Sequence, residues 1–236
     1  MGNKVIFVPT PQHSGTWFLL ELLQGHSEVR NGVMELRDMI GPMRGEITLL
    51  HTHFGQGVTY HPNDAEKFIT DKVLFELVGI HPTVITIRDP LLALITRQLR
   101  HPDLWHSYII TAFMTIVQEL VNKPNVFFLP VDLYKNKSYA QRLQLLKRLF
   151  AFLKLGEEDY LKFWAAGWPR LNTVGYESAK ETRRWYNNRD IDKISALFPE
   201  EYGVLKKREA ILRPFLEKLG YRNLLWWEDV KEKELP

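Results

Sequence analysis

A Ser-Gly-Thr turn follows the first apolar segment of the chain. Residues 4–9 are strand-like, and Gln12-His13-Ser14-Gly15-Thr16 leads from them into an apolar helical stretch. A strand-to-helix turn directs backbone N–H groups and the positive helix end at one point, which suits an anion. Ser14 and Thr16 add hydroxyl donors, and Gly15 allows a ligand to approach closely. A turn that Ser14 or Thr16 merely caps is the alternative.

Three side chains further along are candidates for proton transfer. His51 and His53 alternate in the strand-like segment 47–53, so they share one face of a strand. A histidine at a strand end is a suitable general base near neutral pH. The His-x-His pair also suits a metal ion, but it lacks a third ligand nearby. Glu35 lies between apolar residues and is a second candidate base, because burial raises the pKa of a carboxyl. Structural or solvated roles stay open for all three.

An arginine ends the most β-branched segment of the chain. Residues 83–87 read TVITI, and Arg88 follows directly. A buried strand that ends in Arg delivers a permanent cation to the strand end. Thr96 lies eight residues later, early in a helix that Pro90 begins, and its hydroxyl can reach the same anion. A surface pair with Asp89, or packing under a loop, is the alternative.

The elements that must position these residues alternate along the chain. Such alternation predicts an α/β fold with a central parallel sheet flanked by helices. The expected strands are 4–9, 47–53, 83–87 and 126–129. The expected helices are 16–24, 63–78, 90–100, 103–122, 138–155 and 205–219, within a helical or irregular stretch from 156 to 236. Ligands of parallel sheets bind at the carboxyl ends of the strands, so the chemistry is expected in the loops 9–15, 52–57, 88–90 and 130–134.

The composition excludes several classes of protein. The chain has 236 residues, of which 45% are hydrophobic and 25% charged, as in an ordinary globular domain. It has no Cys, which excludes a disulfide scaffold and a thiolate metal site and fits a cytoplasmic location. A net charge of +3 without a block of Lys and Arg argues against nucleic-acid binding. The sequence has no run of about 18 apolar residues, so it predicts no transmembrane segment.

In their order and spacing, these motifs resemble the sulfotransferases that use 3′-phosphoadenosine 5′-phosphosulfate (PAPS). VPTPQHSGTWFLLELL resembles their 5′-phosphosulfate loop, and TIRDPLLALITRQ resembles their 3′-phosphate motif. LLHTHF resembles the Lys-Thr-His segment that supplies the base, and VFFLPVDLYKNKSYAQRLQLLKRLFAFLKL a later strand-turn-helix segment. The resemblance covers about residues 4–155. It implies a P-loop-like sulfotransferase fold in a single domain over 1–236, with the nucleotide-binding core at about 4–155 and a helical C-terminal region at about 156–230.

The resemblance also implies a role for each motif residue. PAPS would be the donor and 3′-phosphoadenosine 5′-phosphate (PAP) the product, without a metal. The 5′-phosphate and sulfonate would be held by the turn that contains Gln12, His13, Ser14, Gly15 and Thr16. Arg88 and Thr96 would hold the 3′-phosphate, and either Trp17 or Phe18 would stack on the adenine.

The implied reaction transfers a sulfonate in line to a hydroxyl of a small molecule or glycan. His53 would take the proton of the acceptor, and His13 would stabilise the leaving phosphate. Other branches of the family, including the tyrosylprotein type, use a Glu shortly after the first helix, which makes Glu35 a rival base. Aromatic and apolar residues in 104–117 are candidates for an acceptor pocket, with a helix core as the alternative.

The chain departs from the family pattern at several positions. His13 stands where the family loop usually has Lys or Arg, and His51 stands where it has Lys. The third nucleotide-binding element has only loose candidates in 170–175 and 180–185. Thr173-Val174 matches half of a dimerisation segment, so a homodimer is open. Two other functions also stay open, namely a P-loop small-molecule kinase, which needs Mg²⁺ and a loop Lys, and a non-catalytic nucleotide-binding relative.

Overall fold

The structure, a computed structural model, describes residues 4–11, 14–29, 33–35, 47–54, 71–100, 108–159 and 177–227. The chain divides into two compact units. The first comprises Met1–Ile87 and Lys123–Leu171, and the second comprises Arg88–Asn122 and Asn172–Pro236. The first unit contains a parallel sheet, and the described part of the second is helical. A single domain over the whole chain stays a prediction.

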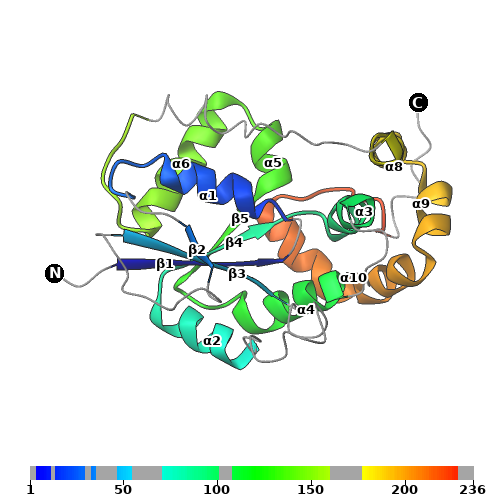
Figure 1. Cartoon of the computed structure of the whole chain (residues 1–236). Helices are drawn as coiled ribbons and strands as arrows, with labels where there is room; N and C mark the ends of the chain where they lie inside the picture. The colour runs from blue at the N-terminus through cyan, green and yellow to red at the C-terminus, as the bar shows by residue number, and fades with distance from the viewer. Residues whose placement is uncertain are drawn as a thin grey trace. The chain divides into compact units, whose positions relative to one another are not determined.

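The sheet of the first unit has five strands in the order β2-β3-β1-β4-β5. They are β1 (Lys4–Pro11), β2 (Val33–Glu35), β3 (Ile47–Phe54), β4 (Thr83–Ile87) and β5 (Val126–Pro130). Neighbouring strands all pair in parallel, so their carboxyl ends lie along one edge of the sheet (Figure 1). The four predicted strands are present, and β2 is an addition that the sequence did not predict. The predicted α/β class is confirmed.

Helices cover both faces of this sheet. They are α1 (Thr16–Gln24), α2 (Asp71–Ile80), α5 (Val131–Asn136) and α6 (Tyr139–Phe152). Figure 1 shows α1, α5 and α6 on one face and α2 on the other. α1 has the predicted bounds, and Ser138 with Gln141 forms a capping box that begins α6. Residues 55–70, which include the first part (63–70) of the predicted helix 63–78, lie outside the described residues.

The predicted loop at 130–134 is wrong, because α5 begins directly after β5. Its side chains Val131 and Tyr134 are 2% and 1% exposed and belong to the core beneath α1. Burial of these two side chains therefore stabilises a helix of only six residues, which is too short to be stable on its own.

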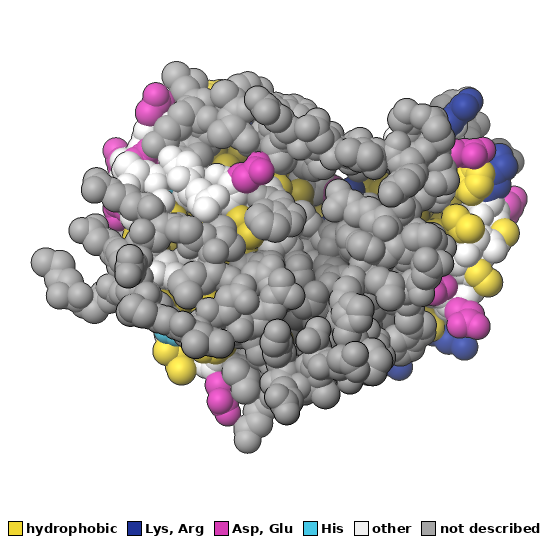
Figure 2. All heavy atoms as spheres, viewed as in Figure 1, with side chains coloured by type: hydrophobic (Ala, Val, Ile, Leu, Met, Phe, Trp, Pro, Cys, Tyr) yellow, Lys and Arg dark blue, Asp and Glu magenta, His cyan; other side chains and the backbone are white. Residues whose placement is uncertain are grey.

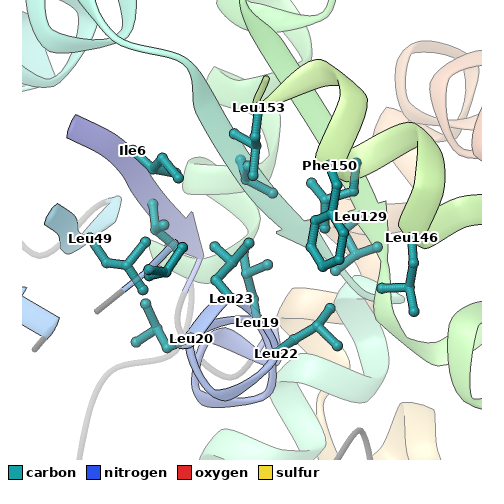
Figure 3. Close-up of a cluster of buried hydrophobic side chains, with 14 of the residues drawn as sticks. Ile6, Leu19, Leu20, Leu22, Leu23, Leu49, Leu129, Leu146, Phe150 and Leu153 are labelled. Carbon is teal, nitrogen blue, oxygen red and sulfur yellow. The ribbon is translucent and has the colours of Figure 1, made fainter. Parts of the chain in front are cut away.

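The core between α1, α6 and the sheet consists mainly of aliphatic side chains, with a few aromatic rings among them. Figure 3 shows leucines of α1 beside Ile6 of β1, Leu49 of β3 and Phe150 of α6. Leu19, Leu20, Leu22 and Leu23 of α1 are each at most 1% exposed. Full burial of one such side chain stabilises the fold by about 1.5–3 kcal/mol. This packing fixes α1, and with it the turn that precedes α1, against the sheet.

The described residues of the second unit form five helices. They are α3 (Pro90–Arg100), α4 (Tyr108–Leu120), α8 (Glu177–Asn187), α9 (Ile191–Leu197) and α10 (Pro199–Leu219). α3 packs against α4 and α8, and α10 packs against α4 and α9. α10 begins with a proline, which suits the first turn of a helix, and ends at Gly220 in the left-handed conformation. The helical character predicted for the C-terminal region is confirmed over 177–219.

The outer surface of α9 and α10 carries mixed side chains. Figure 2 shows Lys and Arg interspersed there with Asp, Glu and hydrophobic side chains. Leu197, Val204 and Ile211 are 43%, 41% and 41% exposed.

Within the described ranges, none of the helices has the length and apolar character that crossing a bilayer requires.

Candidate functional site

Gly15 shapes the turn between β1 and α1. Its φ of +99° lies in the left-handed region, where a residue with a side chain is strained. A Cβ at this position would lie 2.9 Å from Cγ1 of Val131, the first residue of α5. The glycine is thus required by backbone conformation and by packing. The sequence suggested a different reason, the close approach of a ligand, and no contact in the structure tests that suggestion.

The start of α1 has no side-chain cap within the described residues. Gly15 occupies the capping position, and the alternative that Ser14 or Thr16 caps the helix is wrong. The first N–H groups of a helix have no partner within the helix, and the helix dipole gives this end a partial positive charge. The uncapped start of α1 therefore has the backbone geometry of an anion-binding turn.

Buried hydroxyl groups hold this turn against the neighbouring strands. Ser14 is 0% exposed, and its Oγ donates to the carbonyl of Pro11 and lies 2.7 Å from Oγ1 of Thr86 in β4. Thr16 is 5% exposed and hydrogen-bonds through its hydroxyl to that of Thr10 in β1. Both hydroxyls expected to face a ligand are therefore engaged inside the unit. Sequence reasoning missed Thr10 and Thr86, which are ordinary strand residues by type.

Of the two candidates for adenine stacking, Trp17 and Phe18, the structure describes the side chain of Phe18. Phe18 is 4% exposed and packs in the core, with its ring centroid 5.2 Å from that of Tyr134. The side chain of Trp17 lies outside the described residues, so stacking of Trp17 or Phe18 on the adenine stays a prediction. Burial raises the pKa of Tyr134 to about 12, so its phenol stays protonated near neutral pH.

The backbone register places the candidate bases on neighbouring strands. His53 pairs with Thr10 across β3 and β1, whereas Glu35 pairs with His51 across β2 and β3. Neighbouring strands lie about 4.8 Å apart, so Glu35 is one strand farther from β1 than His53. The side chains of these candidates, and the whole of Gln12 and His13, lie outside the described residues.

Arg88 and Thr96, which the sequence paired through their spacing, are in contact in the second unit. Nη1 of Arg88 donates to Oγ1 of Thr96 at 3.0 Å, and Thr96 donates to the carbonyl of Leu92 at 2.8 Å. Arg88 is 8% exposed. An arginine guanidinium has a planar fork of N–H groups whose geometry matches the oxygens of a phosphate. The contact thus brings together the guanidinium and the hydroxyl that the sequence paired, and their binding of a 3′-phosphate stays a prediction.

A cavity of about 340 Å³ lies between α4 and α10 in the second unit. The predicted segment 104–117 contributes Ile110 and Met114 to its wall, while Phe113 and Ile116 of the same helix are core residues. The cavity is also lined by Gln118, Glu200, Glu201, Val204 and Arg208. The helix thus lines a cavity and also contributes to the core, while an acceptor pocket at this segment stays a prediction.

Comparisons with known proteins give similarity to solved structures alone. No protein-family model matches the chain. A search of curated proteins likewise finds no match. Among solved structures, the chain is similar to a mouse sulfotransferase, SULT7A1, whose crystal structure is complexed with PAP. The two chains are 14% identical with a TM-score of 0.43, over 70% of this chain and 62% of that one.

Proposed function

We propose that the chain is a sulfotransferase that moves a sulfonate from PAPS to a hydroxyl of a small molecule or glycan. The observation that carries the proposal is the 3.0 Å hydrogen bond between Arg88 and Thr96. The contact holds the guanidinium beside the hydroxyl of Thr96, and the fork of N–H groups on a guanidinium suits the oxygens of one phosphate. The 3′-phosphate is the group that distinguishes PAPS and PAP from ATP and AMP. A site for it therefore supports this donor over ordinary adenine nucleotides.

The turn before α1 supports the other half of the proposal. Its uncapped N–H groups suit the 5′-phosphate of the donor. In the proposed reaction, the acceptor oxygen attacks sulfur as the bond from sulfur to the bridging oxygen breaks. The bridging oxygen keeps the electron pair and leaves as the 5′-phosphate of PAP. The N–H groups of the turn stabilise the charge that develops on this phosphate.

His53 is the proposed general base, which takes the proton of the acceptor hydroxyl. Its backbone pairs with Thr10, and the hydroxyl of Thr10 contacts Thr16 in the first turn of α1. Glu35 pairs one strand farther from β1, so it is the less favourable base. His13 is proposed to donate a hydrogen bond to the leaving phosphate in place of the usual lysine or arginine.

Binding of PAP and of 5′-AMP, measured by calorimetry, tests the donor. We expect the purified wild-type chain to bind PAP more tightly than 5′-AMP, with or without Mg²⁺. Equal affinities would contradict the proposal, and a requirement for Mg²⁺ would favour a kinase.

Turnover tests the reaction itself. With ³⁵S-labelled PAPS and a panel of hydroxyl compounds, His53→Ala is expected to lose about 10²–10⁴-fold in rate and to keep its PAP affinity. His81→Ala, which changes a histidine between α2 and β4, is the matched control and should keep its activity. An inactive Glu35→Gln beside an active His53→Ala would transfer the role to Glu35. PAP preference without turnover of any acceptor would identify a non-catalytic relative.

A further inference from the structure

The carboxylate of Asp89, directly after Arg88, receives hydrogen bonds from three donors among the described residues of the second unit. Its Oδ1 accepts from the backbone N–H of Leu91 and from Nε1 of Trp226, both at 3.0 Å, and its Oδ2 accepts from the hydroxyl of Tyr186. Asp89 is 1% exposed. An aspartate this deeply buried is uncommon unless donors satisfy its charge, and here the donors come from three separate segments.

These donors tie distant parts of the chain to the start of α3. The bond to Leu91 caps the first turn of α3, where Pro90 offers no N–H. Tyr186 belongs to α8, 97 residues farther along the chain, and Trp226 follows α10, 137 residues farther along. Because Trp226 is 0% exposed, its bond to Asp89 is shielded from water and is stronger than a surface bond.

The position of α3 controls both residues of the proposed 3′-phosphate site. Arg88 lies two residues before the first residue of α3, and Thr96 lies within this helix. Their 3.0 Å contact therefore depends on where the helix begins and on the direction of the backbone at Asp89. The three donors also stabilise the negative charge of Asp89 and hold its carboxylate in one orientation next to Arg88.

We propose that Asp89, held by Tyr186 and Trp226, is a positioning residue that sets the preference of the chain for a 3′-phosphate. The inference rests on the proposed function, and it assigns a specificity role to residues of α8 and of the segment after α10. Asp89 and its two side-chain donors act through Arg88 and Thr96 and do not themselves bind the ligand.

The ratio of the 5′-AMP and PAP dissociation constants measures this preference, because the two ligands differ only in the 3′-phosphate. Tyr186→Phe and Trp226→Phe each remove one donor to Asp89 and keep an aromatic ring in the core. We expect each to lower the ratio about 2- to 10-fold, the effect of one lost hydrogen bond, through weaker PAP binding at unchanged 5′-AMP affinity. Asp89→Asn keeps the oxygen that accepts from Leu91 and Trp226 but replaces the oxygen that accepts from Tyr186, so it should lower the ratio about as much as Tyr186→Phe.

Two variants of the same unit are matched controls. Tyr202→Phe removes a hydroxyl that donates to the carbonyl of Leu225 at 3.4 Å instead of to Asp89. Trp227→Phe changes the neighbouring buried tryptophan, whose Nε1 has no hydrogen-bond partner among the described residues. Neither control should change the ratio, whatever it does to the melting temperature.

The outcomes separate the two proposals. A wild-type chain that binds PAP and 5′-AMP equally would overturn the proposed function, and this inference with it. A wild-type preference that survives in both Tyr186→Phe and Trp226→Phe would overturn the positioning role alone. An equal fall of the ratio in the two controls would do the same, because the effect would then come from general loosening of the unit. Asp89→Leu is also informative where it folds, and is expected to lose the preference.

Discussion

Oγ of Ser14 lies 2.7 Å from Oγ1 of Thr86, which joins the turn before α1 to β4. Both side chains are 0% exposed. The single hydroxyl hydrogen of Ser14 goes to the carbonyl of Pro11, so Thr86 is the donor in its bond to Ser14. A hydroxyl bonded in this way fixes the shape of the turn. In this arrangement the backbone N–H groups, rather than the Ser14 hydroxyl, are the donors suited to an anion.

We expect Thr86→Val to lower the free energy of unfolding by about 1 kcal/mol, because valine keeps the shape of the side chain but removes the donor to Ser14. The loosened turn should also bind PAP a few-fold more weakly. Urea denaturation and calorimetry measure the two effects.

Thr83→Val in the same strand is the control for this variant. Thr83 is also 0% exposed, and its hydroxyl donates to the carbonyl of His81 at 2.9 Å. It should lose a similar amount of stability and keep its PAP affinity. Equal losses of affinity in the two variants would mean that the bond between Ser14 and Thr86 has no special part in ligand binding.

Gly15→Ala is expected to destabilise the fold by about 2–5 kcal/mol. A left-handed backbone costs a residue with a side chain about 1–2 kcal/mol, and overpacking against Val131 adds about 1–3 kcal/mol. Thermal and urea unfolding measure the loss. Adding Val131→Ala should relieve the contact while the backbone strain stays, so the two substitutions should not be additive.

Gly203→Ala in α10 is the matched control, because a Cβ there meets no atom within 4 Å. It should stabilise the chain by about 0.5–1 kcal/mol, since alanine is the better helix former. Similar effects at the two glycines would refute the role assigned to Gly15.

The sequence predicted those elements whose patterns extend over enough residues. The helix 90–100 has the predicted bounds, and the predicted strand at 4–9 extends to Pro11. β2 was missed because Val33–Glu35 is too short to show alternation. α5 was missed because residues 130–134 were expected to form a loop after the strand, and the core contacts of Val131 and Tyr134 are not visible in a local pattern.

The candidate site was predictable where the partners are close in the chain. Arg88 and Thr96 are eight residues apart, and a single helix connects them. The partner of Ser14 is 72 residues away, and those of Asp89 are 97 and 137 residues away. A single sequence contains no signal that joins such positions. The sequence therefore identified the Ser14 turn and the Arg88–Thr96 pair, but not the residues that hold either in place.

Thr96→Val tests the part that Thr96 of α3 has in the proposed 3′-phosphate site with Arg88. Valine removes the oxygen that accepts from Arg88 at 3.0 Å, while its shape still fits α3. We expect PAP affinity to fall about 2- to 10-fold and 5′-AMP affinity to stay unchanged. Thr115→Val on α4 is the control and should leave both unchanged. A Thr96→Val chain with the wild-type preference for PAP would remove Thr96 from the 3′-phosphate site.

The raised pKa of Tyr134 predicts a loss of stability at high pH. Burial raises the pKa of its phenol in the folded chain from 10 to about 12, with Arg142 as a smaller opposing influence. Between these two values the unfolded chain loses the phenolic proton and the folded chain keeps it. The stabilisation is therefore fully present below about pH 10 and is lost as the pH rises through about 12. Urea unfolding between pH 9 and pH 12 should show a falling free energy of unfolding, with a smaller fall in Tyr134→Phe.

Two further tyrosines make this test specific. Burial also raises the pKa of Tyr202, so part of the fall should persist in Tyr134→Phe. Tyr139 is 39% exposed at the start of α6, and Tyr139→Phe removes a phenol that lies largely at the surface. If Tyr139→Phe flattens the pH dependence as much as Tyr134→Phe does, then the effect does not come from the phenol packed against Phe18. Burial of Tyr134 against Phe18 would in that case not account for the fall of the unfolding free energy at high pH.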